Sequence, residues 1–566
     1  MPDSQHRKRF WTRRKVLGAS AGGTAAAALG AFAARAATTS DPSATASPTG
    51  DVVGKVTVGY QGWFACKGDG APINAWWHWS PNSAQPPSPS NHGITSWPDL
   101  RDYTKTYPTA YGNLGNGGVP TLFSSYDQQT VDTHFLWMQQ YGIDTAALQR
   151  FNPMGGEGPT RNDMADKVRS AAEKYDRKYY IMYDVTDWTA FQSEIKTDWT
   201  DRMKAHTASP AYARQNGKPV VCVWGFGFSD DKRDFTPAAC LDVVNWFKDQ
   251  GCYVIGGVPT WWRTGVSDSR PGFGEVYHAF HMISPWMVGR IGKAADSDWF
   301  HDNATVPDLA ECAASGIDYQ PCVLPGDVAE RQRAHGDFMW RQFYNVVRAG
   351  SQGIYISMYD EYNEGNQIAK TAESQDWIPK GSGLLGLDED GTACSADYYL
   401  RLTGDGGRML KGLLAVTATR PTTPYVAGTS AGLPAVSTIT LRSRANNKFV
   451  TAENAGTSSL VANRDAAGPW ERFDRLDLGD GRIALRAQAN GQIVCADSAG
   501  AAALGSSRLA IGPWETFRLI THADGTVSLL AEVNGRYVTA DDAGASPLIA
   551  NRAAAGVWEK FDLATV

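Results

Sequence analysis

The chain has 566 residues, a length that predicts two or three domains. Its formal net charge is −6 and no block of like charge stands out beyond the N-terminus, so we expect no nucleic-acid partner, because phosphate binding needs a basic face. The 20 Trp and 22 Tyr mildly favour a protein that handles sugars, because aromatic faces pack against sugar rings, although such residues also fill cores.

The first 36 residues resemble a twin-arginine export signal. Arg13 and Arg14 precede a weakly apolar run rich in Ala and Gly, and 34–36 (ARA) offers a small-x-small cleavage site. A transmembrane anchor is the alternative, but Ala and Gly make a poor hydrocarbon span. We therefore expect a secreted, extracellular protein with no membrane association after the signal is removed.

Two polar, Pro-containing stretches divide the remaining chain. Residues 37–50 and 416–436 are predicted linkers, which leaves globular parts at 51–415 and 437–566. The eight Cys show no paired C-x-x-C spacing, which argues against a zinc site. We also expect no other metal and no cofactor. Export permits disulfides, and Cys240–Cys252 and Cys312–Cys322 are candidate pairs by proximity alone.

The part from 51 to 415 alternates short apolar runs with amphipathic stretches. Helices are expected at 162–175, 237–250 and 328–349, for example, and eight strands at 55–60, 144–149, 178–183, 219–224, 253–257, 281–285, 319–323 and 353–358. This order predicts an α/β fold, a (β/α)8 TIM barrel with long loops. A doubly wound open sheet is the alternative, but no Gly-rich nucleotide loop follows the first strand.

Most of these strands run into aromatic or polar residues, and the carboxyl ends of barrel strands meet at one mouth. A sugar cleft needs aromatic platforms, polar groups for hydroxyls and two acids. The candidate substrate-binding residues are Tyr60, Trp63, Trp77, His78, Arg150, Asp184, Trp224, Trp261, Trp262, Trp286, Tyr362 and Asn363. A structural role is an open alternative for His78, and a helix-capping role for Asp184.

Glu361 and Glu364 are the candidate catalytic pair. Glycosidic cleavage needs one carboxyl to protonate the leaving oxygen and a second to activate a nucleophile or stabilise charge. Two Glu three residues apart at a strand end can face one cleft if the chain turns there into a short helix. A solvated acidic loop is the alternative, since this spacing is common.

Residues 361–368 (EYNEGNQI) resemble the E-W-x-E-G-T-x-I signature of glycoside hydrolase family 99, the endo-α-mannosidases. Residues 124–144 and 218–221 are similar to that family as well, and the match fits a wider family 71/99-like group of secreted bacterial proteins. The resemblance implies that Glu361 acts as a base on the sugar 2-hydroxyl and Glu364 as the general acid. Asp360, Tyr362, Asn366 and Ala369 depart from the family pattern, which leaves mannan specificity open.

The leading expectation is therefore a secreted glycoside hydrolase that is endo-acting on an α-linked polysaccharide such as α-mannan. One rival is an α-1,3-glucanase, as in family 71, and another is a pentoside-releasing exo-glycosidase. A rival of a different class is a non-catalytic glycan-binding surface lectin.

The part from 437 to 566 repeats three times with a period of 44 residues. The repeated positions include Asn446, Asn490 and Asn534, and a Trp-Glu-x-Phe that begins at Trp470, Trp514 and Trp558. Three copies of one four-stranded β unit predict a β-trefoil, and the Trp and Phe of each copy are expected in its core. The segment resembles fascin-like trefoils, which implies a carbohydrate-binding domain; a purely structural or adhesion module is the alternative.

Overall fold

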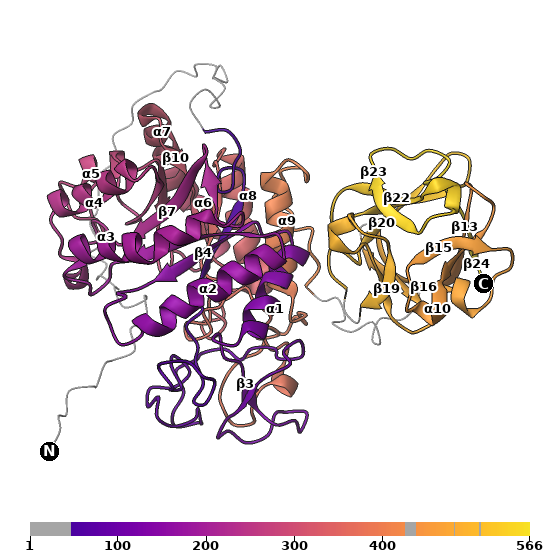
Figure 1. The fold of residues 1–566 in the computed structure, drawn as a ribbon, viewed down its shortest axis with the longest axis horizontal. Coiled ribbons are helices and arrows are strands. Elements are labelled where there is room, and N and C mark those ends of the chain that lie inside the picture. Colours follow the sequence, from indigo (N-terminus) through magenta and orange to yellow (C-terminus); the bar gives the residue numbers. More distant parts are fainter. Residues whose placement is uncertain (1–46, 425–436, 480, 509–510) are drawn as a thin grey trace, which may run out of the picture.

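The computed structural model describes residues 47–424 and 437–566, except 480 and 509–510. Figure 1 shows an α/β domain followed by an all-β domain. The predicted signal at 1–36, most of the first linker and residues 425–436 of the second lie outside the described residues, so those assignments stay predictions. Within the described ranges, no helix has both the length and the apolar character to cross a bilayer.

Nine parallel strands form the curled sheet of the α/β domain. In spatial order they are β10 (Asp318–Tyr319), β9 (Met282–Pro285), β8 (Tyr253–Val258), β7 (Lys218–Trp224), β5 (Lys178–Asp184), β4 (Thr145–Arg150), β1 (Val56–Tyr60), β12 (Ile354–Ile356) and β11 (Cys322–Val323). The short β6 (Arg214–Gln215) pairs antiparallel with β7. Every predicted strand is present within two residues of its expected bounds, except that the strand at 319–323 is split in two.

The split strand closes the sheet into a barrel. β10 and β11 are separated only by Gln320 and Pro321, and they pair with opposite ends of the sheet. The Gln320 amide donates to the Ile283 carbonyl (2.9 Å), and the Pro321 carbonyl accepts from the Tyr355 amide (3.0 Å). One continuous segment therefore joins β9 to β12, and the predicted eight-segment barrel is confirmed.

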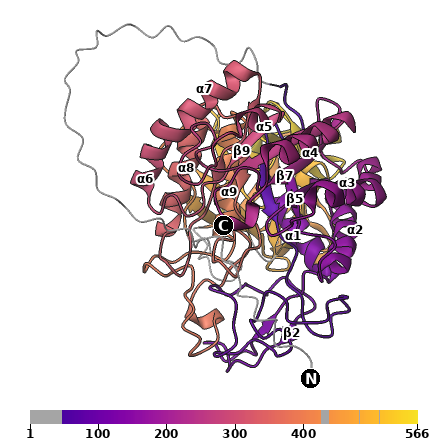
Figure 2. The same ribbon diagram turned by 90° about the vertical axis from the view of Figure 1, so that its left-hand side faces the viewer.

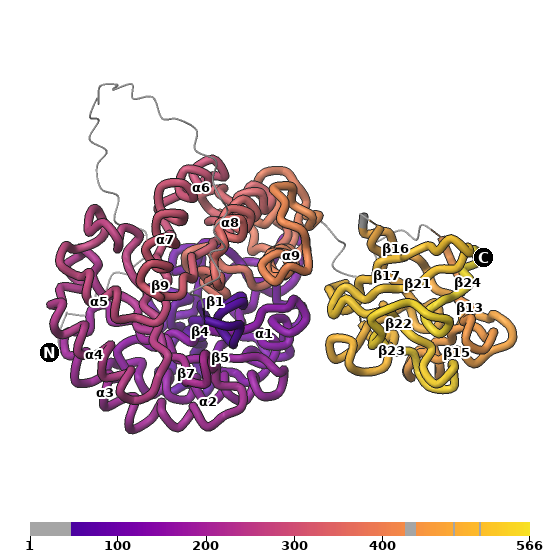
Figure 3. The backbone as a smooth tube through the Cα atoms, turned by 90° about the horizontal axis from the view of Figure 1, so that it is seen from above, coloured from indigo at the N-terminus to yellow at the C-terminus, as the bar shows by residue number. Residues whose placement is uncertain are grey.

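Helices cover the outer face of this barrel (Figures 2 and 3). They are α1 (Gln128–Gln140), α2 (Gly158–Lys174), α3 (Phe191–Asp201), α4 (Pro237–Asp249), α5 (Gly274–His278), α6 (Ala294–Phe300), α7 (Val306–Ser315), α8 (Asp337–Arg348) and α9 (Tyr398–Leu410). The helix expected at 328–349 begins only at Asp337, so that prediction was too long. Arg331, Ala334 and His335 have positive φ, which an α-helix cannot accommodate.

Two long loops meet at the carboxyl end of the barrel. One connects β1 to α1 and carries the small hairpin of β2 (Tyr107–Pro108) and β3 (Thr121–Leu122); the other connects β12 to α9. Isolated bridges join them at Ser96–Leu385, Pro98–Thr371 and Leu114–Pro379. Figures 1 and 2 both show this loop-rich region projecting from one end of the domain.

The C-terminal domain consists of three four-stranded units. The first unit comprises β13 (Ser437–Ser443), β14 (Phe449–Ala452), β15 (Leu460–Arg464) and β16 (Phe473–Gly479). The second comprises β17 (Arg482–Ala487), β18 (Ile493–Cys495), β19 (Gly505–Arg508) and β20 (Phe517–Thr521). The third comprises β21 (Val527–Ala531), β22 (Arg536–Ala540), β23 (Leu548–Arg552) and β24 (Phe561–Thr565). The first and last strands of the units pair in a closed antiparallel ring, and each middle pair forms a hairpin. The closed antiparallel arrangement of three similar units confirms the predicted all-β domain.

The repeated Asn residues are structural. In each unit the Asn side-chain amide donates to the carbonyl sixteen residues further on (2.7–2.8 Å), and its oxygen accepts from the amide two residues on. The repeated Phe residues lie in the common core, as predicted. The prediction for the Trp residues was wrong: none belongs to that core, and Trp558 is 37% exposed.

The eight Cys are all buried, free thiols. The candidate pairs Cys240–Cys252 and Cys312–Cys322 therefore do not form disulfides. Nearness in sequence does not bring two Cβ atoms into bonding geometry, and each of these thiols is packed in the apolar core instead.

Candidate active site

The candidate pair occupies one tight turn that follows β12. The Glu364 amide donates to the Glu361 carbonyl (3.2 Å), and so does the Asn366 amide (3.4 Å), so a hydrogen-bonded turn replaces the short helix expected there. Glu361 is fully buried and Glu364 is 3% exposed. The two carboxyls therefore lie beneath packed side chains at the carboxyl end of the barrel.

Gln61, directly after β1, holds Glu361. Its side-chain amide donates to Glu361 Oε1 (2.9 Å), across the neighbouring strands β1 and β12. The Asp360 carboxylate accepts the backbone N–H groups of Gln61 and Gly62 (both 2.8 Å). Burial raises the pKa of Asp360 to about 6, and these two N–H donors partly offset that rise. The ends of the two strands are thus tied together around Glu361.

An aromatic stack begins at Trp63, two residues after Gln61. Trp63 stacks on His78 with ring centroids 3.8 Å apart, and lies parallel to Phe151 at 5.6 Å. Trp77 meets His78 edge to face at 5.3 Å. Burial, helped by the positive charge of Arg161, lowers the pKa of His78 well below its usual value, so the ring is neutral.

Arg161 joins this stack to Gln61. It lies in the first turn of α2, over the Phe151 ring (5.2 Å), and donates to the Gln61 carbonyl (2.5 Å). Sequence reasoning missed both Gln61 and Arg161. Gln61 could have been found by alternation, since it continues the inward face of Thr57 and Gly59, but no local signal marks Arg161.

Tyr362 packs into the same region from the turn itself. Its ring meets Phe64 and Phe123 edge to face (6.1 and 5.7 Å), and its hydroxyl donates to the Lys370 carbonyl (2.9 Å). Asn363 is half-buried beside it. The structure therefore brings Trp63, Trp77, His78, Tyr362 and Asn363 to the loops around the candidate pair.

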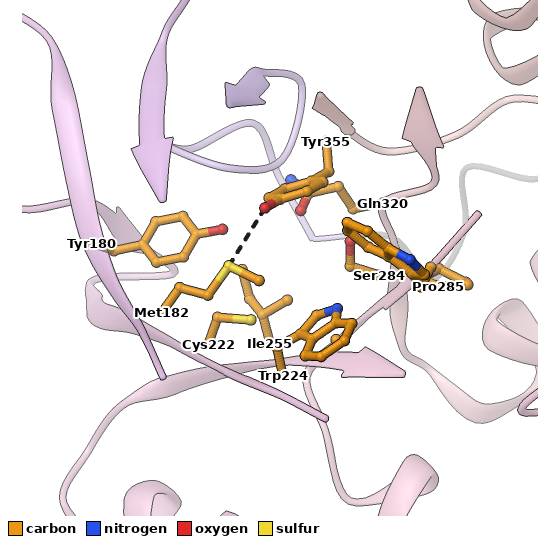
Figure 4. A pocket seen from close by; sticks show the side chains of 11 residues that line it. Tyr180, Met182, Cys222, Trp224, Ile255, Ser284, Pro285, Gln320 and Tyr355 are labelled. Carbon is orange, nitrogen blue, oxygen red and sulfur yellow. Dashed lines mark hydrogen bonds between the residues drawn. The ribbon is translucent and has the colours of Figure 1, made fainter. Parts of the chain in front are cut away.

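A second group of predicted residues lies in and above the barrel interior (Figure 4). Trp224 and Trp286 meet edge to face at 5.4 Å and line a void of about 10 Å³ that has room for about one water molecule. Figure 4 also shows the Tyr355 hydroxyl pointing to the Met182 sulfur (3.6 Å). Asp184 accepts from the Thr186 amide and hydroxyl at the end of β5.

Three predicted residues point instead into the layer between sheet and helices. The Tyr60 hydroxyl bonds to His134 Nδ1 (2.9 Å), Arg150 forms a buried ion pair with Asp198 (2.6 Å), and Trp262 Nε1 donates to Asp308 (3.0 Å). Side chains alternate along a strand, so the terminal residue of β1 or β4 faces outward when its neighbour faces the interior. Trp261 is half-buried beside Trp299. These contacts give Tyr60, Arg150 and Trp262 structural roles.

In the described part of the chain, no group of three or more His, Cys, Asp and Glu residues could hold a metal ion.

No family model and no curated protein matches the chain. Among solved structures, the α/β part is similar to a family GH99 endo-α-mannosidase from Bacteroides thetaiotaomicron, with 13% identity, 64% of this chain and 98% of that chain covered, and a TM-score of 0.46. A second structure of that enzyme, with bis-tris-propane, gives 15% identity over the same shares and the same score. The designed three-fold protein ThreeFoil covers 22% of this chain and 96% of its own, with 23% identity and a TM-score of 0.21.

Proposed function

We propose that this chain is a glycoside hydrolase in which Glu361 and Glu364 are the catalytic carboxylates. The observation that carries the proposal is the position of the pair: both Glu come from one turn at the carboxyl end of a parallel barrel, where barrel enzymes keep their chemistry. The half-buried Trp63–His78 stack supplies an aromatic surface of the kind that a sugar cleft uses.

The contacts of Glu361 suit a base. A hydrogen bond from the Gln61 amide favours the ionised form of a carboxylate, which is the form that accepts a proton. Glu364 is then the acid that protonates the leaving oxygen. Burial of both groups strengthens their interaction with charge in the transition state, and it requires the covering side chains to move when substrate enters.

The proposed substrate is an α-linked polysaccharide such as α-mannan, cleaved internally. An α-1,3-glucan and a pentoside cleaved from the chain end are the alternative substrates. The proposal includes secretion through the N-terminal signal and binding of glycan by the C-terminal domain, which carries two repeated Trp residues that are at least partly exposed, Trp470 and Trp558.

Replacing either carboxylate tests the assignment. Glu361→Gln and Glu364→Gln should each lower turnover by about 10²-fold or more, because each amide keeps the shape and loses the proton transfer. Release of reducing ends from yeast mannan, fungal α-1,3-glucan and arabinoxylan measures the loss. Asp234→Asn is the control, an exposed acid on the loop between β7 and α4 that should leave the activity within about twofold.

A glycan-binding protein without catalysis is the second candidate, and the burial of both carboxylates favours it. It predicts that the unmutated protein releases no reducing ends from any of the three polymers while it still binds at least one of them. Turnover that disappears in both Gln variants excludes this second candidate.

A further inference from the structure

An open groove lies beside the turn that carries the candidate pair. It has a volume of about 260 Å³ and is lined by His92, Ile94 and Thr95 of one long loop, by Ala329, and by residues 382–385 of the other long loop. Ligand pockets usually start at about 300 Å³, so the groove has the size for one small ring rather than a large ligand.

Hydrogen bonds and close packing attach the groove to the catalytic turn. The Thr95 amide donates to the Tyr362 carbonyl (3.0 Å). Gly365 has positive φ, and a Cβ there would lie 2.7 Å from the Thr95 hydroxyl, so this position is restricted to glycine. Because Gly365 directly follows Glu364, Thr95 of the groove wall packs against the turn that carries the candidate acid.

The lining fits a neutral sugar. Leu385 is half-buried and supplies apolar surface for the C–H face of a ring, and the buried Ile94 and Leu384 complete the apolar part of the lining. Within the described structure, His92 Nδ1 and Thr95 Oγ1 are buried and make no hydrogen bond, although buried polar groups usually have a partner. The lining contains no Asp, Glu, Lys or Arg, so nothing there would pair with a charged substituent.

We propose that this groove is a subsite for a further, uncharged sugar unit of the substrate, one that lies beyond the units at the cleaved bond. The inference rests on the proposed function and deepens it, because an occupied subsite outside the cleavage site makes the enzyme prefer longer chains. His92 and Thr95 then recognise the hydroxyls of that unit.

Ala329→Trp tests the subsite, since Ala329 is exposed and an indole there would fill the groove from outside. The full-length protein is assayed on a ladder of α-manno-oligosaccharides. The variant should lose at least tenfold in kcat/KM on the longer members and stay within twofold of the unmutated protein on the shortest one that is cleaved. Thr95→Val should reproduce a smaller, about fivefold loss on the same long members.

Val119→Trp is the control, because it adds the same ring at a position that is 70% exposed and outside the groove. It should change neither end of the ladder. Equal loss on short and long members in Ala329→Trp, or no loss on either, overturns the subsite while the hydrolase proposal stands. If the unmutated protein cleaves no member of the ladder, the proposed substrate is wrong. The subsite is then tested by calorimetric titration of the same oligosaccharides into the unmutated protein and into Ala329→Trp, and equal affinities for the two proteins overturn it.

Discussion

At the scale of single residues, the side chain next to the proposed base decides how that base behaves. Gln61 is neutral, fully buried and fixed by its own backbone N–H to Asp360, so its side-chain amide has little freedom to leave Glu361. A donor held in this way stabilises the ionised carboxylate without adding a competing charge. Gln61 is therefore a positioning residue for Glu361.

Gln61→Leu should move the acidic limb of the kcat/KM profile to higher pH. The ionised base loses a hydrogen bond in this variant, so it accepts a proton from water more readily and is lost from the active form earlier as pH falls. We expect a shift of about one pH unit, read from rates between pH 4 and pH 8. Thr57→Val, on the same inward face but deeper in the barrel, is the control; a limb that moves equally in both variants would contradict the assignment.

Asp308 is a second buried acid, and it affects stability rather than catalysis. It accepts from Trp262 Nε1 (3.0 Å) and Arg263 Nε (3.1 Å), and burial raises its pKa to about 7 despite those donors. Between about pH 4 and pH 7 the folded protein therefore binds this proton more tightly than the unfolded chain does, so the free energy of unfolding falls as pH rises through that window.

Asp308→Asn should remove this dependence. From pH 5 to pH 8, the fall in the free energy of unfolding should be smaller in the variant than in the unmutated protein by about 2–3 kcal/mol. Urea titrations of both proteins at the two pH values measure the difference. Parallel falls in the two proteins would show that Asp308 is ionised in the folded state at pH 5.

At the scale of elements, the apolar runs and the repeat period of the sequence were sufficient to predict most of the fold. The strand at 253–257, for instance, is marked by its own β-branched and aromatic residues, and its place in the barrel follows from chain order. The direction of a strand's last side chain depends on register, which composition does not reveal. Tyr60 and Arg150 were for that reason predicted in the cleft but lie on the outer face.

The three units of the C-terminal domain interlock through Gly–Asn contacts. A Cβ on Gly456, Gly500 or Gly544 would lie 2.1–2.3 Å from the repeated Asn of the next unit, Asn490, Asn534 and Asn446 respectively. Each of these glycines also has a φ near +80°. The repeated Gly and Asn residues thus form the same close contact between each pair of adjacent units.

Gly500→Ala should destabilise the C-terminal domain by about 2 kcal/mol or more, because the methyl group meets both a strained backbone and the Asn534 side chain. Gly505→Ala lies in the same unit with no atom within 4 Å of the added Cβ, and should change stability by less than about 1 kcal/mol. Denaturant unfolding followed by tryptophan fluorescence compares the two. A similar loss of stability in both variants would show that the Gly–Asn contact does not stabilise the domain.

At the scale of the whole molecule, contact with the barrel breaks the threefold equivalence of the C-terminal domain. Arg408 of α9 forms an ion pair with Glu532, and the Tyr141 hydroxyl lies 3.4 Å from the position of a Cβ on Gly512. Figures 1 and 3 both show α1 and α9 on the side of the barrel that faces this domain. Trp514 follows Gly512 and is 2% exposed, whereas its equivalent Trp558 is 37% exposed.

The three equivalent Trp residues should therefore respond differently to the same change. Trp470→Ala and Trp558→Ala should each weaken binding of the full-length protein to insoluble polysaccharide by about tenfold, with stability changed by less than about 1 kcal/mol, because exposed aromatic rings are available to stack on sugars. Trp514→Ala should cost about 3–5 kcal/mol of stability, since it empties a buried site. Pull-down on the insoluble polymer and urea unfolding give both quantities for each variant. If all three variants have the same polysaccharide binding and the same stability, the Trp rings do not contribute to glycan binding by the C-terminal domain.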